Sequence, residues 1–508
     1  MQRSIGKMVV GAMLAHAAIH SPDAPATICA GTGRTFSFGD LDARANRLAN
    51  ALAAQGFRKG DVVAFLVSNR AEIVELYFAL ARAGIVGVPL NYRLAAPEMD
   101  ALIAAMGATG LVYEDRFAPE VARFATPRRL TVRIDGAPGP GEIGYEPLLD
   151  AAPATPPAVE IEEDDPQYFN LTSGTTGLPK AYLLTQYNNV TLDPMFRAFD
   201  LSRHDVTMTV FPAFGRVGFA WIAAAILHRI PNVLANFEAG AALDLIARHG
   251  VTILNLVPTM AAMMLAEQEK RGAGTADLPS LRGIVFAGAI LPEPIRAATE
   301  ARLCGRVYEY YGMQETGALV ASTPEDRARA PGSVGRPLLF SELRVVDEAG
   351  RDLPPGETGE ILGRSPGAAS GYFQNAEKTT ETFRDGWVHT GDLGALDADG
   401  YLFIHGRRKD MIVTGGQNVH AAEVEETLLR AEGVEDCAVF GLPDPLWGES
   451  VTALIIGTAA PAALDAHCRA ALAGFKVPKR FILEQDPLPR TPTGKVQKFL
   501  LVERFSGA

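Results

Sequence analysis

The sequence predicts an α/β protein of wound lobes with largely parallel sheets. Two observations carry this prediction: apolar residues recur at helical spacing in several segments, and short β-branched runs follow those segments. Residues 41–55 have a helical face of leucine and alanine that ends at Gly56, and 62–67 is typical of a buried strand. A second helix over 71–83 precedes a strand over 85–88. Because helices and strands alternate, we expect parallel pairing with helices covering the sheet.

The same alternation continues at 243–249 with 251–254, and again near 284–286. Between these blocks, residues 137–157 are rich in proline, glycine and alanine. Such a composition favours a surface connection over a regular element. We therefore expect this segment to separate two wound lobes.

The last part of the chain is different, with short strands and Asp/Gly turns from residue 385 onward. This pattern predicts a small β-barrel-like subdomain at the end of a large N-terminal domain over 1–408. A small α+β C-terminal domain over 409–508 follows. Its expected elements are a helix over 423–431, with Val424 and Leu428 facing inward, and strands over 437–441 and 451–456.

Composition limits the function classes. The 508 residues include 47 basic and 59 acidic side chains, a formal charge of −12, which argues against nucleic acid or an anionic membrane as a partner. The four cysteines are scattered, so neither a disulfide framework nor a thiolate metal site is expected. The apolar stretch near the N-terminus loosely resembles a secretory signal, but His16 interrupts it. No apolar run approaches the about 20 residues of a membrane span, so we expect a cytoplasmic protein.

The most distinctive segment is the loop over 171–180, which has four hydroxyl side chains, two glycines and a lysine in ten positions. Glycines let backbone N–H groups turn toward an anion, hydroxyls add donors, and lysine adds positive charge, which suits a polyphosphate. The loop lacks the G-x-x-x-x-G-K-[ST] pattern, because Leu178 and Pro179 separate Gly177 from Lys180. A flexible Ser/Thr/Gly turn is the alternative interpretation of this loop taken alone.

Further motifs follow in order, and together they resemble the adenylate-forming superfamily of acyl-CoA synthetases, aryl-CoA ligases, carrier-protein-loading adenylation domains and firefly luciferase. The resemblance extends from Thr35 to Lys495 and rests on segments 171–180, 286–292, 310–317, 387–392, 406–412, 415–420 and 489–496. It implies a large N-terminal domain and a small, mobile C-terminal domain. It also implies ATP, Mg²⁺ and coenzyme A as cofactor and co-substrates.

The resemblance assigns ATP-binding positions residue by residue. The phosphate-binding positions of the loop are Thr172, Ser173, Gly174, Thr175, Thr176, Gly177 and Lys180. Gly288 and Ala289 match the adenine-side loop, and Tyr311 matches the residue that stacks on adenine. Thr172 and Glu315 match metal-binding positions. Gln314 replaces the family's threonine at the α-phosphate; an amide also donates there but reaches further.

Later motifs imply the remaining roles. Asp392 matches the aspartate that binds both ribose hydroxyls, and Arg407 the arginine that also touches ribose. Lys409 matches the hinge between the domains. The positions that line the tunnel for the CoA thiol arm are Gly415 and Gly416. Lys495 matches the catalytic lysine, which reduces repulsion between the carboxylate and the α-phosphate and stabilises the transition state.

The acyl pocket departs from the family pattern. Segment 212–218 aligns with a stretch whose histidine flanks the acid, and here Gly215 takes its place after Phe214. The missing ring leaves room for a bulkier acid, unless Phe214 or a neighbour fills it. Arg216 could pair with a second carboxylate of a dicarboxylic acid, but we expect it to be exposed on the surface.

These motifs predict an ATP-dependent acid–CoA ligase that forms acyl-CoA, AMP and pyrophosphate through an acyl-adenylate. We expect a medium- or long-chain fatty acid as substrate. The alternatives are an aryl acid–CoA ligase, an acyl-AMP ligase that loads a separate carrier protein, and, more distantly, a non-catalytic nucleotide-binding sensor or a light-emitting oxygenase. A homodimer through the large domain is compatible with the sequence.

Overall fold

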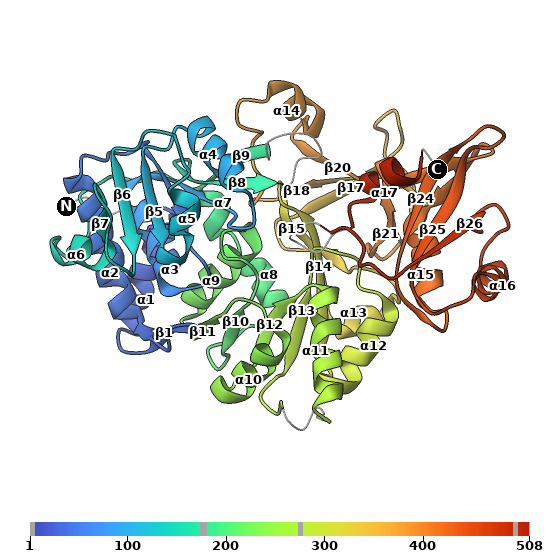
Figure 1. The fold of residues 1–508 in the computed structure, drawn as a ribbon, viewed down its shortest axis with the longest axis horizontal. Helices are drawn as coiled ribbons and strands as arrows, with labels where there is room; N and C mark the ends of the chain where they lie inside the picture. The colour runs from blue at the N-terminus through green and yellow to red at the C-terminus, as the bar shows by residue number, and fades with distance from the viewer. Residues whose placement is uncertain (1–5, 173–179, 273–277, 491–495, 507–508) are drawn as a thin grey trace.

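The computed structural model describes residues 6–172, 180–272, 278–490 and 496–506, which form four sheets with helices around them (Figure 1). A seven-stranded sheet has the order β7-β6-β5-β3-β4-β8-β9 and is parallel except for its edge strand β9, which is antiparallel to β8. Its strands are β3 (Val62–Leu66), β4 (Val86–Pro89), β5 (Gly110–Glu114), β6 (Leu130–Ile134), β7 (Ile143–Gly144), β8 (Pro166–Thr172) and β9 (Lys180–Thr185).

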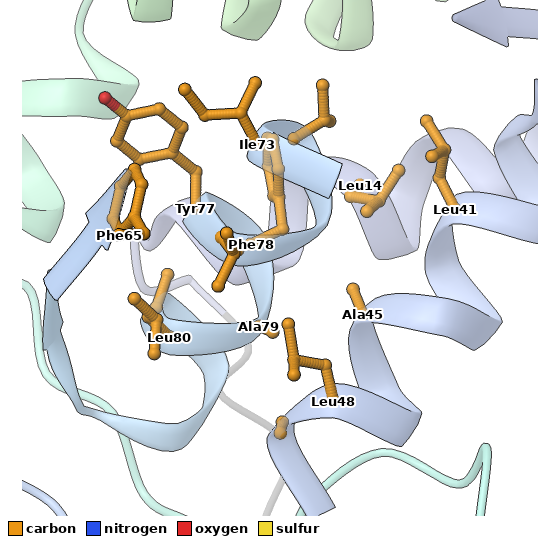
Figure 2. Close-up of a cluster of buried hydrophobic side chains, with 14 of the residues drawn as sticks. Leu14, Leu41, Ala45, Leu48, Phe65, Ile73, Tyr77, Phe78, Ala79 and Leu80 are labelled. Carbon is orange, nitrogen blue, oxygen red and sulfur yellow. The ribbon is translucent and has the colours of Figure 1, made fainter. Parts of the chain in front are cut away.

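Helix α3 (Ala71–Ala83) is buried along its whole length and confirms the helix predicted over the same residues. It lies between β3 and α2 (Phe38–Ala54), and Figure 2 shows Leu41, Ala45 and Leu48 pointing from α2 toward it. These α2 side chains are fully buried, as the helical spacing predicted. Helix α1 (Val10–His20), formed by the apolar N-terminal stretch, packs on both α2 and α3.

A nine-stranded mixed sheet has the order β16-β15-β14-β13-β12-β10-β11-β1-β2. Its strands are β1 (Pro25–Cys29), β2 (Thr35–Ser37), β10 (Thr207–Thr209), β11 (Asn232–Leu234), β12 (Ile253–Leu256), β13 (Gly283–Phe286), β14 (Val307–Met313), β15 (Gly317–Ser322) and β16 (Arg336–Pro337). The run from β10 to β14 is parallel, in agreement with the predicted helix–strand alternation.

The prediction that 137–157 separates two lobes is wrong. This segment contains β7 and α6 (Tyr145–Asp150), and Tyr145, Leu148 and Leu149 are buried. These apolar side chains anchor it to the seven-stranded sheet, to which β8 and β9 also belong. After β1 and β2, which belong to the nine-stranded sheet, the chain forms the whole seven-stranded sheet and returns to the nine-stranded sheet between β9 and β10.

A five-stranded antiparallel sheet forms the small β subdomain, and it begins at Glu342, earlier than the predicted residue 385. Its strands are β17 (Glu342–Val346), β18 (Gly359–Arg364), β19 (Phe383–Arg384), β20 (Trp387–Leu396) and β21 (Leu402–Arg407). The sheet is open, because β17 pairs with β18 while β19 and β21 pair with β20. The subdomain resembles a barrel in that its strands are short and antiparallel.

The C-terminal sheet is formed by β22 (Met411–Thr414), β23 (Gln417–His420), β24 (Val434–Asp444), β25 (Gly448–Gly457) and β26 (Arg480–Glu484). Helix α15 (Ala421–Leu429) buries Val424 and Leu428 against it, as predicted. In Figure 1 this sheet lies beyond the β subdomain, at the opposite end of the molecule from the seven-stranded sheet.

The other helices cover the sheets and connect their strands. They are α4 (Ala96–Ala105), α5 (Ala118–Val121), α7 (Gln186–Val190), α8 (Asp193–Ala198), α9 (Arg216–His228), α10 (Ala239–His249), α11 (Pro258–Lys270), α12 (Glu293–Arg302), α13 (Pro324–Arg329), α14 (Ala376–Thr382), α16 (Pro461–Ala471) and α17 (Lys498–Phe505). Within the described ranges, no helix has the length and apolar character needed to cross a membrane.

The two large sheets are joined through Asn69, a buried residue shortly after β3. Its Nδ2 donates to the carbonyls of Phe211 and Ala235 at 2.7 and 2.8 Å, and its Oδ1 accepts from Ala213 N at 2.7 Å. Tyr77 of α3 also donates to the Ala213 carbonyl, at 2.9 Å. These bonds fix the segment that leads into Gly215.

Replacing Asn69 with leucine is expected to lower the free energy of unfolding by about 3 kcal/mol, because it leaves buried carbonyls and an amide without partners. Denaturant unfolding followed by tryptophan fluorescence measures this loss. The control is Asn50→Ala, at the partly exposed end of α2, where the amide also donates to two carbonyls. This variant is expected to lose under about 1 kcal/mol. Equal losses of unfolding free energy in the two variants would show that the buried hydrogen bonds of Asn69 contribute no more to stability than those of Asn50.

Candidate active site

Two segments predicted to bind ATP lie at the same end of the nine-stranded sheet, because the strands that lead to them are parallel. Strand β13 pairs in parallel with β14, with Phe286 opposite Glu309. Gly288 and Ala289 follow β13 and are exposed, while Tyr311 is further along β14 in the same direction. Crevices at the carboxyl ends of strands in open α/β sheets are common ligand sites.

The predicted phosphate loop connects β8 to β9, which pair with Thr172 opposite Lys180. Ser173, Gly174, Thr175, Thr176 and Gly177 lie outside the described residues. The Lys180 ammonium is 5.3 Å from the centroid of the Tyr372 ring. The β8–β9 edge therefore brings a positive charge to the segment around Tyr372.

Three predicted nucleotide-binding residues are in contact. Asp392 is buried, its Oδ2 accepts from the Tyr311 hydroxyl at 2.8 Å, and its Oδ1 lies 3.2 Å from Arg407 Nε. The register of β20 and β21 places Asp392 opposite Arg407. Burial, and next the neighbouring Asp392, raise the pKa of the Tyr311 phenol well above 10. Tyr311 therefore stays protonated and donates to Asp392 across the physiological range.

Glu315 is the predicted metal-binding residue that the structure describes in full. Its carboxylate is largely buried, and its Oε1 accepts from the Tyr372 hydroxyl at 2.7 Å. Among the described residues, no group of three or more His, Cys, Asp or Glu side chains could hold a metal ion. A single carboxylate fits Mg²⁺, which is usually held by one or two carboxylates together with substrate phosphates and waters. The side chain of Thr172, the other predicted metal-binding residue, is outside the described part.

Gln314 is fixed at both its side chain and its backbone. Its Oε1 accepts from Asn170 Nδ2 at 2.9 Å, and its carbonyl accepts from the Tyr182 hydroxyl and the Arg216 guanidinium. Because Asn170 occupies the amide oxygen, the amide NH₂ is the group that can donate to a ligand. The amide at this position thus keeps the donor that the family's threonine has.

The structure corrects the expectation for Arg216. It is the first residue of α9, only 5% of it is exposed, and it donates to backbone carbonyls. At Gly215, the residue before it, an added Cβ would make an ordinary contact, with the Pro212 carbonyl at 3.5 Å. Phe214 is half-buried and packs edge-on against Tyr92, with ring centroids 5.1 Å apart.

The predicted hinge and CoA residues are in the C-terminal part. Lys409 is exposed in a three-residue turn, Arg408–Asp410, between β21 and β22. Gly415 and Gly416 form the tight turn from β22 to β23, with φ of +56° and +74°, values that favour glycine. A Cβ at Gly415 would meet the Trp447 ring at 2.7 Å. The absent side chain thus leaves room for an aromatic surface beside the turn.

Lys495, the predicted catalytic residue, lies outside the described residues. The structure also adds residues that the motifs did not indicate, namely Tyr372 beside Glu315 and Tyr182 beside Gln314. Both are far along the chain from the groups they contact. No local pattern identifies them, because their role follows from where the sheets meet.

Comparison with known proteins identifies the family. Residues 14–373 match the AMP-binding enzyme family, and residues 423–495 match the AMP-binding enzyme C-terminal domain. The chain belongs to the AMP-binding enzyme family. Members of this family that resemble it are acid–thiol ligases, and this protein is an AMP-forming acid–thiol ligase that uses ATP, Mg²⁺ and CoA.

Three relatives illustrate the similarity. Feruloyl-CoA synthase of an Amycolatopsis species is 37% identical over 506 residues, covering 96% of each chain. The fatty acid–[acyl-carrier-protein] ligase ScoC of Streptomyces coeruleorubidus is 35% identical and covers 96% of this chain and 95% of its own. The crystal structure of ATP-bound MatB from Rhodopseudomonas palustris is 31% identical, with a TM-score of 0.88 over 98% of this chain and 99% of that one. The AMP-binding enzyme fold therefore extends over both parts of the chain.

Replacing Asp392 with asparagine is expected to weaken AMP binding about tenfold, because one charged acceptor that Tyr311 and Arg407 hold in place is lost. Isothermal titration of AMP measures this. Asp352→Asn is the matched control, since Asp352 pairs with Arg344 in the same subdomain at an exposed position. Unchanged AMP affinity in Asp392→Asn would exclude Asp392 from the nucleotide site.

Proposed function

We propose that the protein joins a bulky monocarboxylic acid to CoA in two steps. In the first, a carboxylate oxygen attacks the α-phosphorus of ATP, the bond to the β-phosphate oxygen breaks, and pyrophosphate leaves. In the second, the CoA thiolate attacks the acyl carbonyl carbon, the bond to the phosphate oxygen breaks, and AMP leaves with the electron pair. The observation that carries this proposal is the contact of Tyr311, Asp392 and Arg407 beside Gln314 and Glu315.

Each residue of this group has a proposed task in the first step. Asp392 accepts hydrogen bonds from the ribose hydroxyls with Arg407 beside it, and Tyr311 presents its ring to adenine next to Gly288 and Ala289. The amide of Gln314 donates to the α-phosphate. The residues proposed to hold the β- and γ-phosphates are Thr172, Ser173, Gly174, Thr175, Thr176, Gly177 and Lys180.

The charge balance of this step needs cations. Lys495 is proposed to lie between the acid and the α-phosphate, where it reduces their repulsion and stabilises the developing charge. Mg²⁺, held by Glu315 and Thr172, would supply charge neutralisation on the phosphates. Glu315 is kept in place for this task by the Tyr372 hydroxyl.

The second step needs a different set of residues at the acyl-adenylate. A rotation of the C-terminal domain at the hinge is proposed to bring them there. We propose the boundary at 408, with Lys409 as the pivot between the domains over 1–408 and 409–508. The turn Arg408–Asp410 has no buried residue, which supports a rotation at this point. Gly415 and Gly416 then line the path of the thiol arm.

The acid is proposed to have a bulky carbon skeleton, because Gly215 brings no side chain to this position and a Cβ there would make an ordinary contact, with the Pro212 carbonyl at 3.5 Å. An aryl acid is the first candidate, in line with the substrate named for feruloyl-CoA synthase and with the aromatic pair Phe214 and Tyr92. A medium- or long-chain fatty acid is the second. Loading of a carrier protein instead of CoA is the rival for the second step, as the name of ScoC suggests.

The reaction consumes ATP and CoA, so we propose that it takes place in the cytoplasm. The four cysteines are free and buried, which fits a reducing compartment.

A panel of aryl, aliphatic and dicarboxylic acids tests the substrate. We expect acid-dependent pyrophosphate release with Mg·ATP and AMP release that requires CoA, highest for bulky monocarboxylic acids. Gly215→Val is expected to lower kcat/KM for the bulkiest accepted acid about tenfold and to leave short acids nearly unchanged.

Gly305→Val is the control for the panel, because Gly305 has open space and lies away from these residues. AMP release that requires a carrier protein would support the rival second step. No turnover of any acid, together with intact ATP binding, would contradict the proposed substrate class.

Lys409→Pro is expected to impair the thioester step more than adenylation, because proline restricts the backbone at the pivot. The two half-reactions are measured separately, with pyrophosphate release for the first and conversion of preformed acyl-adenylate for the second. Lys409→Ala, which removes the side chain alone, is the control. Equal loss of both half-reactions in Lys409→Pro would contradict a hinge role.

A further inference from the structure

Arg216 is a buried cation in an unusual setting. Its Nη1 donates to the Gln314 carbonyl at 2.5 Å and its Nη2 donates to the Gly367 carbonyl. Buried arginines in proteins are usually paired with carboxylates, because an isolated charge is costly to desolvate. Within the described residues, both of its hydrogen bonds go to backbone carbonyls and no carboxylate forms an ion pair with it.

The segment that Arg216 contacts is fixed at three successive carbonyls. The Gln314 carbonyl accepts from Arg216 and Tyr182, the Glu315 carbonyl accepts from Ala369 N at 2.8 Å, and the Thr316 carbonyl accepts from Ser365 Oγ at 2.7 Å. Because the backbone is held at three adjacent peptides, the side chains of Gln314 and Glu315 leave it in a fixed direction. Arg216 therefore acts on two residues of the ATP site without touching their side chains.

The surrounding chain leaves space for this guanidinium. A Cβ added at Gly317 would lie 3.0 Å from Arg216 Nη2, and one added at Gly367 would lie 3.1 Å from the same atom. Both distances are tighter than ordinary contacts, so a side chain at either position would require the guanidinium to shift by a few tenths of an ångström. Two glycines on separate segments thus make room for the arginine fork between them.

We propose that Arg216 is a positioning residue of the adenylation step, one that orients Gln314 and Glu315 and places an unpaired positive charge near the ATP phosphates. This inference rests on the proposed roles of Gln314 and Glu315. A dicarboxylic acid does not need to be invoked, because the guanidinium is buried and already donates to two carbonyls. Lysine would not replace it, since one ammonium lacks the planar fork that reaches both carbonyls.

The test compares Arg216→Lys with wild type, first by isothermal titration of Mg·ATP in the absence of acid. We expect the Kd for Mg·ATP to rise about fivefold or more, because the charge is kept but the two carbonyls are no longer held together. Adenylation of the best acid in the panel is expected to fall at least about tenfold, while thioester formation from preformed acyl-adenylate changes less than twofold.

Arg282→Lys is the matched control. Arg282 also donates to two backbone carbonyls, those of Phe199 and Asp200, but it pairs with Asp205 away from the ATP site. We expect this variant to keep the wild-type Kd for Mg·ATP. Tyr182→Phe removes the other donor to the Gln314 carbonyl and is expected to raise the same Kd about twofold, which tests the proposal even if Arg216→Lys does not fold.

An unchanged Kd in both Arg216→Lys and Tyr182→Phe would overturn the proposal. So would equal losses in the two half-reactions, or a loss confined to dicarboxylic acids. If wild type binds Mg·ATP but turns over no acid, the proposed substrate class fails, and the Kd comparison still decides the role of Arg216.

Discussion

The candidate active site depends on buried polar side chains that hold backbone carbonyls where the two large sheets meet. Asn69 bonds the segment before Gly215 from the side of the seven-stranded sheet, and Arg216 and Tyr182 bond the carbonyl of Gln314. A buried carbonyl needs a hydrogen-bond partner, so these bonds also define how the segments lie. The specificity of the site is thereby connected to the stability of the fold.

Arg407, one of the proposed nucleotide-binding residues, lies next to the proposed hinge. Arg407 is the last residue of β21, opposite Asp392 on β20, and the exposed turn with Lys409 follows it directly. In the proposed cycle, a rotation at this turn would begin next to a residue that touches the ribose. Rigid antiparallel pairing on one side and an exposed turn on the other suit a hinge, since only a few backbone dihedrals need to change.

The departures from the family pattern have separate physical meanings. Gln314 keeps a donor for a phosphate because Asn170 occupies its amide oxygen. Gly215 brings no side chain to its position, and in the proposed function this bears on the size of the acid. The first concerns the chemistry common to the family, whereas the second concerns the choice of substrate, so the two are tested by different measurements.

The sequence by itself determined the α/β class and several helix and strand positions, and it pointed to the residues proposed to bind the nucleotide. Periodicity and turn residues act locally, which is why the helix over 71–83 and the inward side chains of α15 were predicted correctly. The resemblance of the motifs to the adenylate-forming superfamily likewise indicated Tyr311, Asp392 and Arg407, which the structure brings into contact.

Only the tertiary structure decided which segments share a sheet and which polar groups are buried. The segment 137–157 was misjudged because its anchoring residues are buried against strands that its own composition does not reveal. Arg216 was expected at the surface, yet its carbonyl partners lie 98 and 151 residues away along the chain. Such long-range hydrogen bonds have no local signature, because they exist only once the sheets have assembled.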